Sequence, residues 1–307
     1  KLPCMLQEAG AIPLPAKSLQ AIISAMRDGE VTIERNGTVA TIRCNRALFK
    51  LNGLPADEFP KVPVFKESRE FRMQKAMLNR GFRYTEYAIS KDIARYVLNG
   101  IYTSFQDGKL TMVASDGRRL ALFENELEFP ESQQVSIDLP SRAVGEIHRL
   151  LSDAGDVMVR ITQSQAAFDF EDTLLITKII DGKYPNYREV IPSRYNERII
   201  IPAQDLSETV RRVSLLAAKK TNMVRFRFAP GSMEVLTSST DLGEANEELP
   251  IDYNGRELTI SFNVDYILDP LKAVGEGEVS IDLLDSSGPC VMRVADEFLY
   301  VLMPMHS

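Results

Sequence analysis

The fold is set by the stretch from Pro15 to Pro60, which reads PAKSLQAIISAMRDGEVTIERNGTVATIRCNRALFKLNGLPADEFP. Its pattern returns at Pro140 to Pro185 and at Asn263 to Pro304, so about 45 residues occur three times in one chain. Each copy opens with an apolar lead, continues with the periodicity of a helix, and then alternates apolar and polar residues as a strand does. Successive copies start about 125 residues apart, the length of a domain, so the pattern predicts duplication of whole domains.

The helix expected in each copy has one apolar face, with apolar residues at the 3, 4 and 7 spacing of a buried helical stripe. The stripe residues are Leu19, Ile22, Ile23 and Met26, then Val144, Ile147 and Leu151, then Val264, Ile267, Leu268 and Leu271. A glycine follows each stripe, at Gly29, Gly155 and Gly277, where a helix C-terminus favours a left-handed residue. We therefore expect each helix to bury this face and to end at its glycine.

Two further segments separate the copies, from Lys66 to Pro130 and from Ile191 to Leu258, and each is helical first and strand-like later. The helical parts are expected at Met73 to Ser90 and at Ala203 to Lys220. A full domain then consists of two halves, each a helix with a sheet, which gives an α+β fold of helices on antiparallel sheets. The predicted domains are residues 1–65, 66–192 and 193–307.

Only about ten residues precede the first copy, so the first domain is expected to lack its N-terminal half. Either that half, about 60 residues, precedes Lys1 in the full protein, or this chain departs from its own pattern. Because Lys1 is not a methionine, we expect the first.

Composition favours a soluble, cytoplasmic protein of several domains. The chain has 307 residues, no run of 18 apolar residues, and three scattered cysteines, Cys4, Cys44 and Cys290. An odd number of cysteines without a CxxC spacing predicts reduced thiols rather than a disulfide framework or a zinc site. The net charge of −7, taken alone, argues against tight nucleic-acid binding, but the distribution of charge over the surface matters more than its sum.

Catalytic motifs are missing from the sequence. It contains no P-loop, GxGxxG, HExxH or GxSxG motif, and its only histidines are His148 and His306. We interpret His148 as a structural residue because it lies within a predicted helix, beside Ile147. The turn SDGRR, from Ser115 to Arg119, allows three interpretations: a phosphate-binding loop, a carboxylate with two guanidinium partners, or a hairpin turn with solvated charges. Its spacing favours the hairpin turn.

Five longer stretches carry a resemblance to a known family. They are YVLNGI at Tyr96–Ile101, VASDGRRLA at Val113–Ala121, IDGKYPNY at Ile180–Tyr187, FNVDYILD at Phe262–Asp269 and YVLMPM at Tyr300–Met305. With them the chain resembles the bacterial sliding clamp, the beta subunit of DNA polymerase III, over essentially its whole length. The resemblance implies a head-to-tail homodimeric ring of six similar domains, with sheets outside and helices around a hole for duplex DNA. It also implies a non-enzymatic processivity factor that needs no cofactor and is placed on DNA by a separate ATP-driven clamp loader.

A ring that holds DNA topologically needs only modest basicity on its lining helices, because strong phosphate contacts would slow sliding. The DNA-facing candidates are Lys17, Arg27, Lys75, Arg80, Arg83, Arg142, Arg149, Arg211, Arg212, Lys219, Lys220 and Lys272. For each of them an ordinary solvated charge is an equally good interpretation. Arg212, Lys219 and Lys220 are spaced to share one helix face. An acidic exterior would let a chain of net charge −7 still admit DNA.

The resemblance further implies a hydrophobic groove between the second and third domains. The groove would receive short motifs from the polymerase III alpha subunit, other polymerases and repair proteins. By matching motif, its lining is Leu98, Ser115, Gly117, Arg119, Leu120, Pro185, Val190, Asn263, Tyr266, Pro289, Val301, Met303, Pro304 and Met305. Methionines suit such a site because their flexible, polarizable side chains accept varied apolar anchors. Without the resemblance, Leu98, Leu120 and Val301 would be interpreted as strand core.

The resemblance places the contact between two copies at an edge strand of domain one. In that arrangement, Phe49 and Leu51 of one copy meet the region of Leu215 and Leu216 in the other. Both elements are present in the chain, so the sequence is compatible with a closed ring.

The sequence therefore predicts a DNA sliding clamp, with two alternatives left open. One is a clamp-like scaffold that binds replication peptides without encircling DNA. The other is an enzyme that uses Asp116, Arg118 and Arg119 on a phosphorylated substrate. Glu189 and the His306-Ser307 end depart from residues common in the family, which leaves the preference among partners open.

Overall fold

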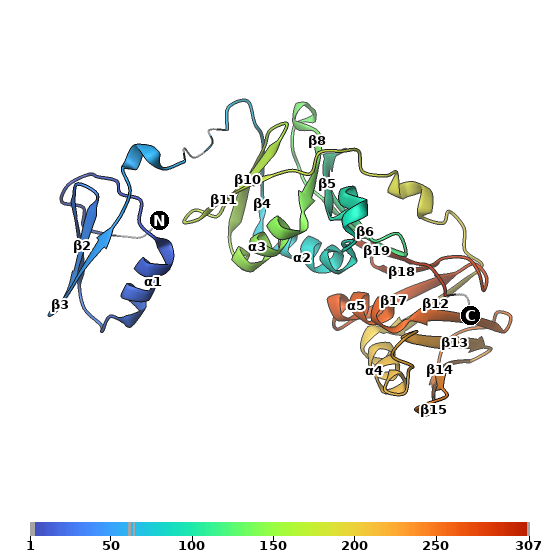
Figure 1. The fold of residues 1–307 in the computed structure, drawn as a ribbon. Coiled ribbons are helices and arrows are strands. Elements are labelled where there is room, and N and C mark those ends of the chain that lie inside the picture. The colour runs from blue at the N-terminus through green and yellow to red at the C-terminus, as the bar shows by residue number, and fades with distance from the viewer. Residues whose placement is uncertain (1–3, 61–62, 64, 306–307) are drawn as a thin grey trace. The chain divides into compact units, whose positions relative to one another are not determined.

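The structure, a computed structural model, describes residues 4–60, 63 and 65–305, and Figure 1 shows its ribbon. The chain forms two compact units, Lys1–Lys66 and Glu67–Ser307. Neighbouring strands pair antiparallel in both units, as in the β1–β2, β9–β10, β7–β19 and β13–β14 pairs. Among the residues described, no helix is both long and apolar enough to cross a membrane.

The first unit is one helix with one sheet. In chain order its elements are α1 (Ala16–Ala25), β1 (Val31–Asn36), β2 (Val39–Cys44), β3 (Ala47–Asn52) and the short 3-10 helix η1 (Ala56–Glu58). The sheet has the order β1-β2-β3, so β2 is central and β3 lies at an edge. Ala40, Ile42 and Cys44 alternate along β2 and are buried, which is the period-2 pattern of a strand with one covered face.

The apolar stripe of α1 is only partly covered. Leu19, Ile22 and Met26 are half-buried, whereas Ile23 is 41% exposed. A three-stranded sheet is too narrow to cover a whole helix face, because its twist leaves one flank of the helix in solvent. The prediction of a fully buried stripe is therefore wrong for this helix.

The second unit starts with a helix and sheet that precede the second repeat. Its first elements are β4 (Arg69–Gln74), α2 (Lys75–Thr85), η2 (Glu86–Ala88), η3 (Ile93–Leu98), β5 (Gly100–Gln106), β6 (Lys109–Ser115), β7 (Arg119–Glu126) and η4 (Glu131–Gln133). The repeat follows as β8 (Val135–Pro140), α3 (Ser141–Leu150), β9 (Asp156–Ile161), β10 (Gln165–Asp169), β11 (Leu174–Lys178) and η5 (Tyr187–Val190).

The same order of elements then occurs again. The preceding half comprises β12 (Glu197–Pro202), α4 (Ala203–Ser214), β13 (Met223–Ala229), β14 (Ser232–Ser239) and β15 (Gly243–Pro250). The third repeat comprises β16 (Leu258–Asn263), α5 (Val264–Val274), β17 (Glu278–Leu283), β18 (Cys290–Val294) and β19 (Phe298–Leu302).

An eight-stranded sheet runs through the second unit in the order β12-β17-β18-β19-β7-β6-β5-β8. It is flanked by two four-stranded sheets, β11-β10-β9-β4 and β15-β14-β13-β16. The pairing of β7 with β19 joins the two halves of the unit, and it sets Leu120 opposite Val301 and Arg119 opposite Leu302. Because side chains alternate along a strand, Leu120 and Arg119 lie on opposite faces of this sheet.

The helices of the second unit form a layer on one side of the sheets, as Figure 1 shows. Within it α3 contacts α2, α2 contacts α5, and α5 packs on α4. Val144, Ile147, Ile267 and Leu271 are buried against the sheets, so the predicted stripes of α3 and α5 are confirmed.

The prediction that each helix ends at its glycine is wrong. The helices α1, α3 and α5 end at Ala25, Leu150 and Val274, several residues before Gly29, Gly155 and Gly277. Instead, Gly155 and Gly277 take positive φ angles of 84° and 129° directly before β9 and β17. They let the chain turn into the strand, which L side chains resist at such angles.

Both helices of the preceding halves are shorter than predicted. The helix α2 spans Lys75–Thr85 rather than Met73 to Ser90, and α4 ends at Ser214 rather than at Lys220. After α4 the chain turns at Leu215 and Leu216, so Lys219 and Lys220 do not share a helix face with Arg212.

Candidate peptide-binding groove and DNA-facing helices

A hydrophobic cluster covers the face of the eight-stranded sheet opposite the helices. This outer cluster consists of Val113, Leu120, Tyr184, Tyr187, Val291, Leu299 and Val301. Leu98 is half-buried against it. The structure thus brings together three predicted groove residues, Leu98, Leu120 and Val301, at the junction of β7 and β19.

Tyr184 and Tyr187 belong to this cluster and were missed in the sequence. The Tyr184 ring stacks on Tyr102 at a centroid distance of 5.2 Å, and the Tyr187 ring lies tilted to Tyr102 at 5.9 Å. The segment from Tyr184 to Tyr187 reads YPNY, and paired aromatic residues around a proline are the signal that would have indicated them. Both side chains are buried, at 9% and 7% exposed, so they belong to the packed cluster on this face of the sheet.

Two buried polar groups lie close to the cluster. The hydroxyl of Tyr184 and the Oδ1 atom of Asp138 on β8 have no hydrogen-bond partner among the described residues. Burial raises the pKa of the Asp138 carboxyl to about 7. Burial also raises the pKa of the Tyr184 hydroxyl, and the Asp138 charge adds to that rise.

The turn between β6 and β7 is held by its own side chains. The Asp116 carboxylate accepts hydrogen bonds from the amides of Arg118 and Arg119, at 2.9 and 3.1 Å. Gly117 has a φ of +85°, and a Cβ atom there would meet the Arg95 guanidinium. Because Asp116 occupies these amides, the loop cannot offer them to a phosphate, and the phosphate-loop interpretation fails.

Arg119 is not a solvated charge, contrary to our favoured interpretation of the turn. Its side chain is only 9% exposed. Its Nε atom donates to Asp116 at 3.0 Å, its Nη1 atom to Asp269 at 2.6 Å, and its Nη2 atom to the Tyr87 carbonyl at 2.5 Å. Its partner Asp269 lies 150 residues away in sequence, so a local interpretation of the turn could not find it.

The first turn of α5 brings Asn263 and Tyr266 next to Arg119. The Asn263 side chain caps the helix by accepting from the amides of Asp265 and Tyr266, at 3.0 and 3.2 Å. The Arg119 guanidinium carbon lies 4.3 Å from the centroid of the Tyr266 ring, within the range of a cation–π contact.

The C-terminal segment crosses this region after β19. The Met303 amide donates to the Arg118 carbonyl at 3.0 Å, and the Met305 amide donates to the Ser261 carbonyl at 2.7 Å. The Met303 side chain is 45% exposed, Pro304 is buried and Met305 is half-buried. The segment is therefore fixed by its backbone, while Met303 presents an apolar side chain beside the turn of Ser115 and Gly117.

The remaining groove candidates lie at the margin. Pro185 and Val190 are exposed and flank Tyr187, whereas Pro289 lines a small crevice with Tyr195 and Arg293. Glu189 accepts a hydrogen bond from Asn186 at 2.7 Å. The residues His306 and Ser307 lie outside the described residues.

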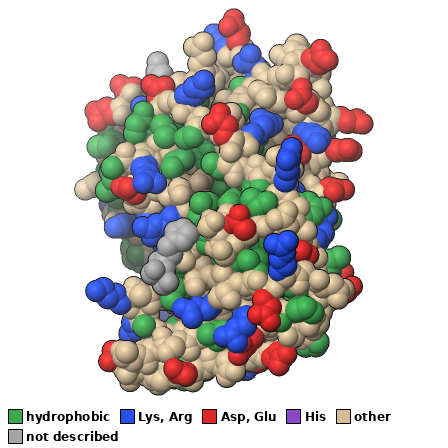
Figure 2. All heavy atoms as spheres, turned by 90° about the vertical axis from the view of Figure 1, so that its right-hand side faces the viewer, with side chains coloured by type: hydrophobic (Ala, Val, Ile, Leu, Met, Phe, Trp, Pro, Cys, Tyr) green, Lys and Arg blue, Asp and Glu red, His purple; other side chains and the backbone are tan. Residues whose placement is uncertain are grey.

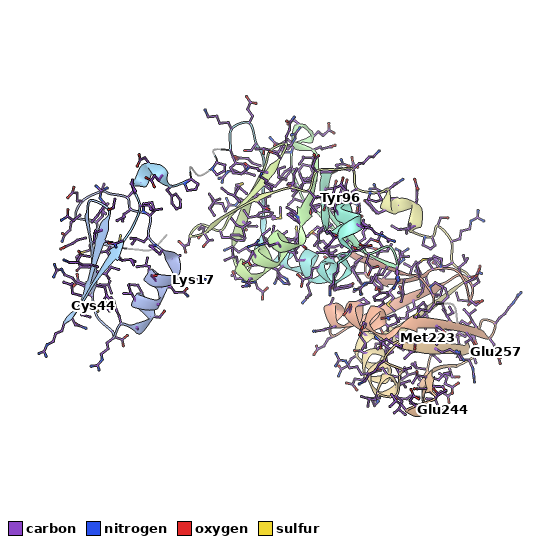
Figure 3. The ribbon with its side chains drawn as sticks, in the orientation of Figure 1. Lys17, Cys44, Tyr96, Met223, Glu244 and Glu257 are labelled. Atoms are coloured by element: carbon purple, nitrogen blue, oxygen red, sulfur yellow. The ribbon has the colours of Figure 1, made fainter. Side chains whose placement is uncertain are left out.

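The predicted DNA-facing residues are exposed, apart from the half-buried Lys75. Figure 3 labels Lys17 on α1, and α3, α4 and α5 carry Arg142, Arg211 and Lys272. Four other candidates already have partners within the protein. Arg80 pairs with Glu297, Arg149 with Glu146, and Arg212 with Glu208 and Glu247, while Arg83 lies over the Tyr84 ring.

Figure 2 shows one end of the molecule, where acidic and basic side chains are interspersed among hydrophobic ones, and the acidic exterior stays a prediction.

Groups suited to catalysis are few in the described part of the chain. His148 contacts Glu86 at 2.8 Å between Nδ1 and Oε2, which fits the predicted structural role. Cys290 is buried, and burial raises the pKa of its thiol to about 12, so it is protonated at neutral pH. No cluster of three His, Cys, Asp or Glu side chains within residues 4–60, 63 and 65–305 is arranged to hold a metal ion.

Repeated helix-and-sheet halves, a continuous helix layer with exposed cations and an apolar site at a domain junction define a DNA clamp. Three domain families of the DNA polymerase III beta subunit match the chain. The N-terminal domain matches residues 3–63, the central domain residues 72–186 and the C-terminal domain residues 188–306.

Comparisons with complete proteins lead to the same family. The chain is 30% identical to the beta sliding clamp of Synechococcus elongatus, over 98% of this chain and 82% of that protein. It is 29% identical to the beta sliding clamp of Chlamydia pneumoniae, over 97% and 82%. A crystal structure of the sliding clamp of Pseudomonas aeruginosa superposes with a TM-score of 0.93 at 30% identity, covering 99% of this chain and 85% of that one.

The chain belongs to the DNA polymerase III beta subunit family, the beta sliding clamps. The predicted fold class is confirmed, and the family consists of non-catalytic processivity factors, which removes the enzyme alternative. The expectation that the first domain lacks its N-terminal half is not borne out, because the N-terminal domain family matches residues 3–63.

Proposed function

We propose that this chain closes into a homodimeric ring around duplex DNA and tethers DNA polymerase III and other replication and repair proteins through the candidate groove. The observation that carries this proposal is that the two faces of one sheet present different chemical surfaces. Helices with exposed cations cover one face, and the apolar outer cluster occupies the other. DNA and a partner peptide can therefore bind at the same time without competing.

The proposal assigns three domains, 1–65, 66–192 and 193–307, and a cytoplasmic location where replication takes place. DNA contacts are sequence-independent, because a ring that holds DNA topologically needs only phosphate contacts, which carry no sequence information. A separate ATP-driven loader opens the ring. The groove residues are those named above, with Leu98, Leu120 and Val301 at the floor and Met303 at the rim.

Two free sheet edges support the dimer contact. The edge strand β3 of the first unit carries Phe49, Lys50 and Leu51, while β15 is the edge of its sheet and carries Glu244 and Glu248. Figure 3 labels Glu244 on that strand. Edge strands with unpaired backbone groups pair readily with another chain, and opposite charges favour one partner edge over others. Leu215, at the end of α4, is 79% exposed and offers Phe49 of a second copy an apolar partner.

Retention on circular DNA tests the proposal. The protein is loaded onto nicked plasmid by a bacterial clamp loader at moderate salt, and the complex is isolated by gel filtration before and after the plasmid is linearised. A ring slides off the ends, so we expect retention on the circle and loss on linearisation. Equal binding to both forms, or peptide binding without retention, would favour the scaffold that does not encircle DNA.

A further inference from the structure

The outer cluster borders on a buried carboxylate. Val301 lies opposite Val291 on β18, and Val291 lies opposite Asp282 on β17. Because residues directly opposite each other in a sheet point to the same face, Asp282 shares the face that carries the outer cluster. Its side chain is only 1% exposed. Burial of a charged carboxylate is costly unless it is paired and hydrogen-bonded, so its cationic partners must lie close by.

Two arginines bind the Asp282 carboxylate. Arg198 on β12 donates from Nε to Oδ1 at 2.6 Å and from Nη2 to Oδ2 at 2.9 Å. Arg293 on β18 donates from Nε to Oδ2 at 3.1 Å. The Arg198 guanidinium also lies 4.5 Å from the centroid of the Tyr195 ring. Two positive charges therefore share one negative charge, and both are held in place by it.

Both guanidiniums keep donors that a ligand can use. Neither Nη1 of Arg198 nor the Nη atoms of Arg293 have an acceptor among the residues that the structure describes. The two side chains are partly exposed, and the exposed Arg194 lies in the same region. A carboxylate accepts well from such donors, because charge-assisted hydrogen bonds are the stronger kind. Donors that are already oriented also spare a ligand the cost of ordering them.

A crevice connects these arginines with the outer cluster. Arg194, Arg293 and Tyr195 line it together with Val291 of the outer cluster and the groove candidate Pro289. The one acidic side chain among its described lining residues is that of Asp282, which the arginines already bind. The crevice therefore presents an excess of positive charge directly beside an apolar surface.

Acidic side chains gather only towards the opposite ends of β17 and β18. A wider hollow of about 550 Å³ there is lined by Glu124, Glu278 and Asp296 as well as by Arg293. Glu124 pairs with Lys109 at 3.2 Å. Glu278 is the first residue of β17, and Asp296 follows the end of β18, so both lie beyond the crevice. The charge on this face thus favours an anionic ligand at the end next to the outer cluster.

We propose that Arg194, Arg198 and Arg293, the arginine cluster around Asp282, bind an acidic side chain of the partner segment whose apolar residue occupies the outer cluster. The inference rests on the proposed peptide-binding function and adds a charged end to the groove. Neighbouring strands lie about 4.8 Å apart, so β17 is about 10 Å from β19, the length of about three residues of extended chain. The acidic residue is therefore expected about three positions from the apolar anchor.

The test uses a fluorescein-labelled peptide with the clamp-binding segment of the polymerase III alpha subunit, titrated with the full chain and followed by anisotropy. Four versions carry Glu or Gln at the third position before or after the apolar anchor. At one of these positions we expect the Glu version to bind about fivefold more tightly than its Gln counterpart. The preference should disappear in 1 M salt, where the screening length is about 3 Å.

Arg293→Gln removes one positive charge and leaves Asp282 with its two bonds from Arg198. This variant should lose the preference for Glu and keep its affinity for the Gln version. Arg194→Glu is a second variant, which does not touch the buried carboxylate, and it should also lose the preference. Arg227→Gln is the matched control, because Arg227 pairs with a single carboxylate, that of Glu234 at 3.0 Å, but lies in another sheet. It should keep the preference.

The peptide pairs separate this inference from the groove proposal. Equal affinities of the wild-type chain for the Glu and Gln versions at both positions would overturn the inference. A preference that persists in both Arg293→Gln and Arg194→Glu would overturn it as well. If the wild-type chain bound no version at all, the groove proposal itself would fail, so the two failures are distinguishable.

Discussion

Leu120 on β7 lies directly opposite Val301 on β19, and the pair joins the two domains on the face of the sheet away from the helices. Each side chain is contributed by a different domain. The floor of the candidate groove therefore exists only where the central and C-terminal domains pair their strands.

Truncation of this pair should weaken peptide binding. Val301→Ala removes two methyl groups from the outer cluster and should cost about 1–3 kcal/mol of unfolding free energy. It should also raise the dissociation constant for the polymerase peptide, because the floor then contains a gap where an apolar anchor packs. The control is Val159→Ala, which truncates an equally buried valine on β9. Equal peptide affinities in the two variants would argue against a groove at Val301.

Dimer formation should depend on Leu215. In Leu215→Asp, a charge replaces an apolar side chain that the proposed interface would bury, so the dimer should dissociate at least about tenfold more readily. Sedimentation equilibrium measures this over a range of protein concentrations. Ile200→Asp serves as control, because Ile200 is 57% exposed on β12 and lies outside the proposed contact. A dimer of unchanged strength in Leu215→Asp would contradict the assignment.

The buried carboxyl of Asp138 should make stability depend on pH. Its pKa is raised from 3.8 to about 7 in the folded protein. Between these values the unfolded chain has released the proton while the folded chain retains it, so the unfolding free energy falls as pH rises. The contribution of the Asp138 proton to the unfolding free energy is fully present below pH 4 and is lost by about pH 7. It amounts to at most about 4 kcal/mol.

Asp138→Asn isolates this contribution from those of the other carboxyls. The unfolding free energy of the variant should not show the fall with rising pH that Asp138 causes, and the variant should be more stable than the wild type at pH 8. Urea unfolding at pH 5 and 8 measures both effects. If the difference between the two proteins were the same at both pH values, Asp138 would not titrate in this range.

The repeat in the sequence predicted correctly those helices whose apolar face packs within one domain. The stripes of α3 and α5 contain Val144, Ile147, Ile267 and Leu271, and all four are buried. Ile23 has the same spacing but remains exposed, because spacing states which face is apolar and not how much of it a small sheet covers. The end of α4 was missed for a related reason: no Gly or Pro follows Ser214 before Lys220, so no local signal ends the helix.

The candidate site was less accessible to sequence analysis, because its contacts connect distant segments. Arg119 looked like part of a solvated turn, and its partner Asp269 belongs to another domain. The resemblance supplied the groove residues, and their part in peptide binding stays a prediction. It did not indicate Tyr87 or Asp269, which contact the Arg119 side chain on the face of the sheet opposite Leu120.

Arg142 and Lys272 should contribute to DNA affinity more than Arg212 does. Arg212 is held by Glu208 and Glu247, at 3.3 and 2.7 Å, so part of its charge is already compensated. Each phosphate contact releases condensed counterions, and loss of one should reduce the slope of log affinity against log salt by about 1. We expect Arg142→Gln with Lys272→Gln to reduce that slope by about 2 on short duplex DNA, and Arg212→Gln to reduce it less. Lys178→Gln, on strand β11, is the surface-charge control and should leave the slope unchanged. An unchanged slope in the double variant would mean that these two cations do not face DNA.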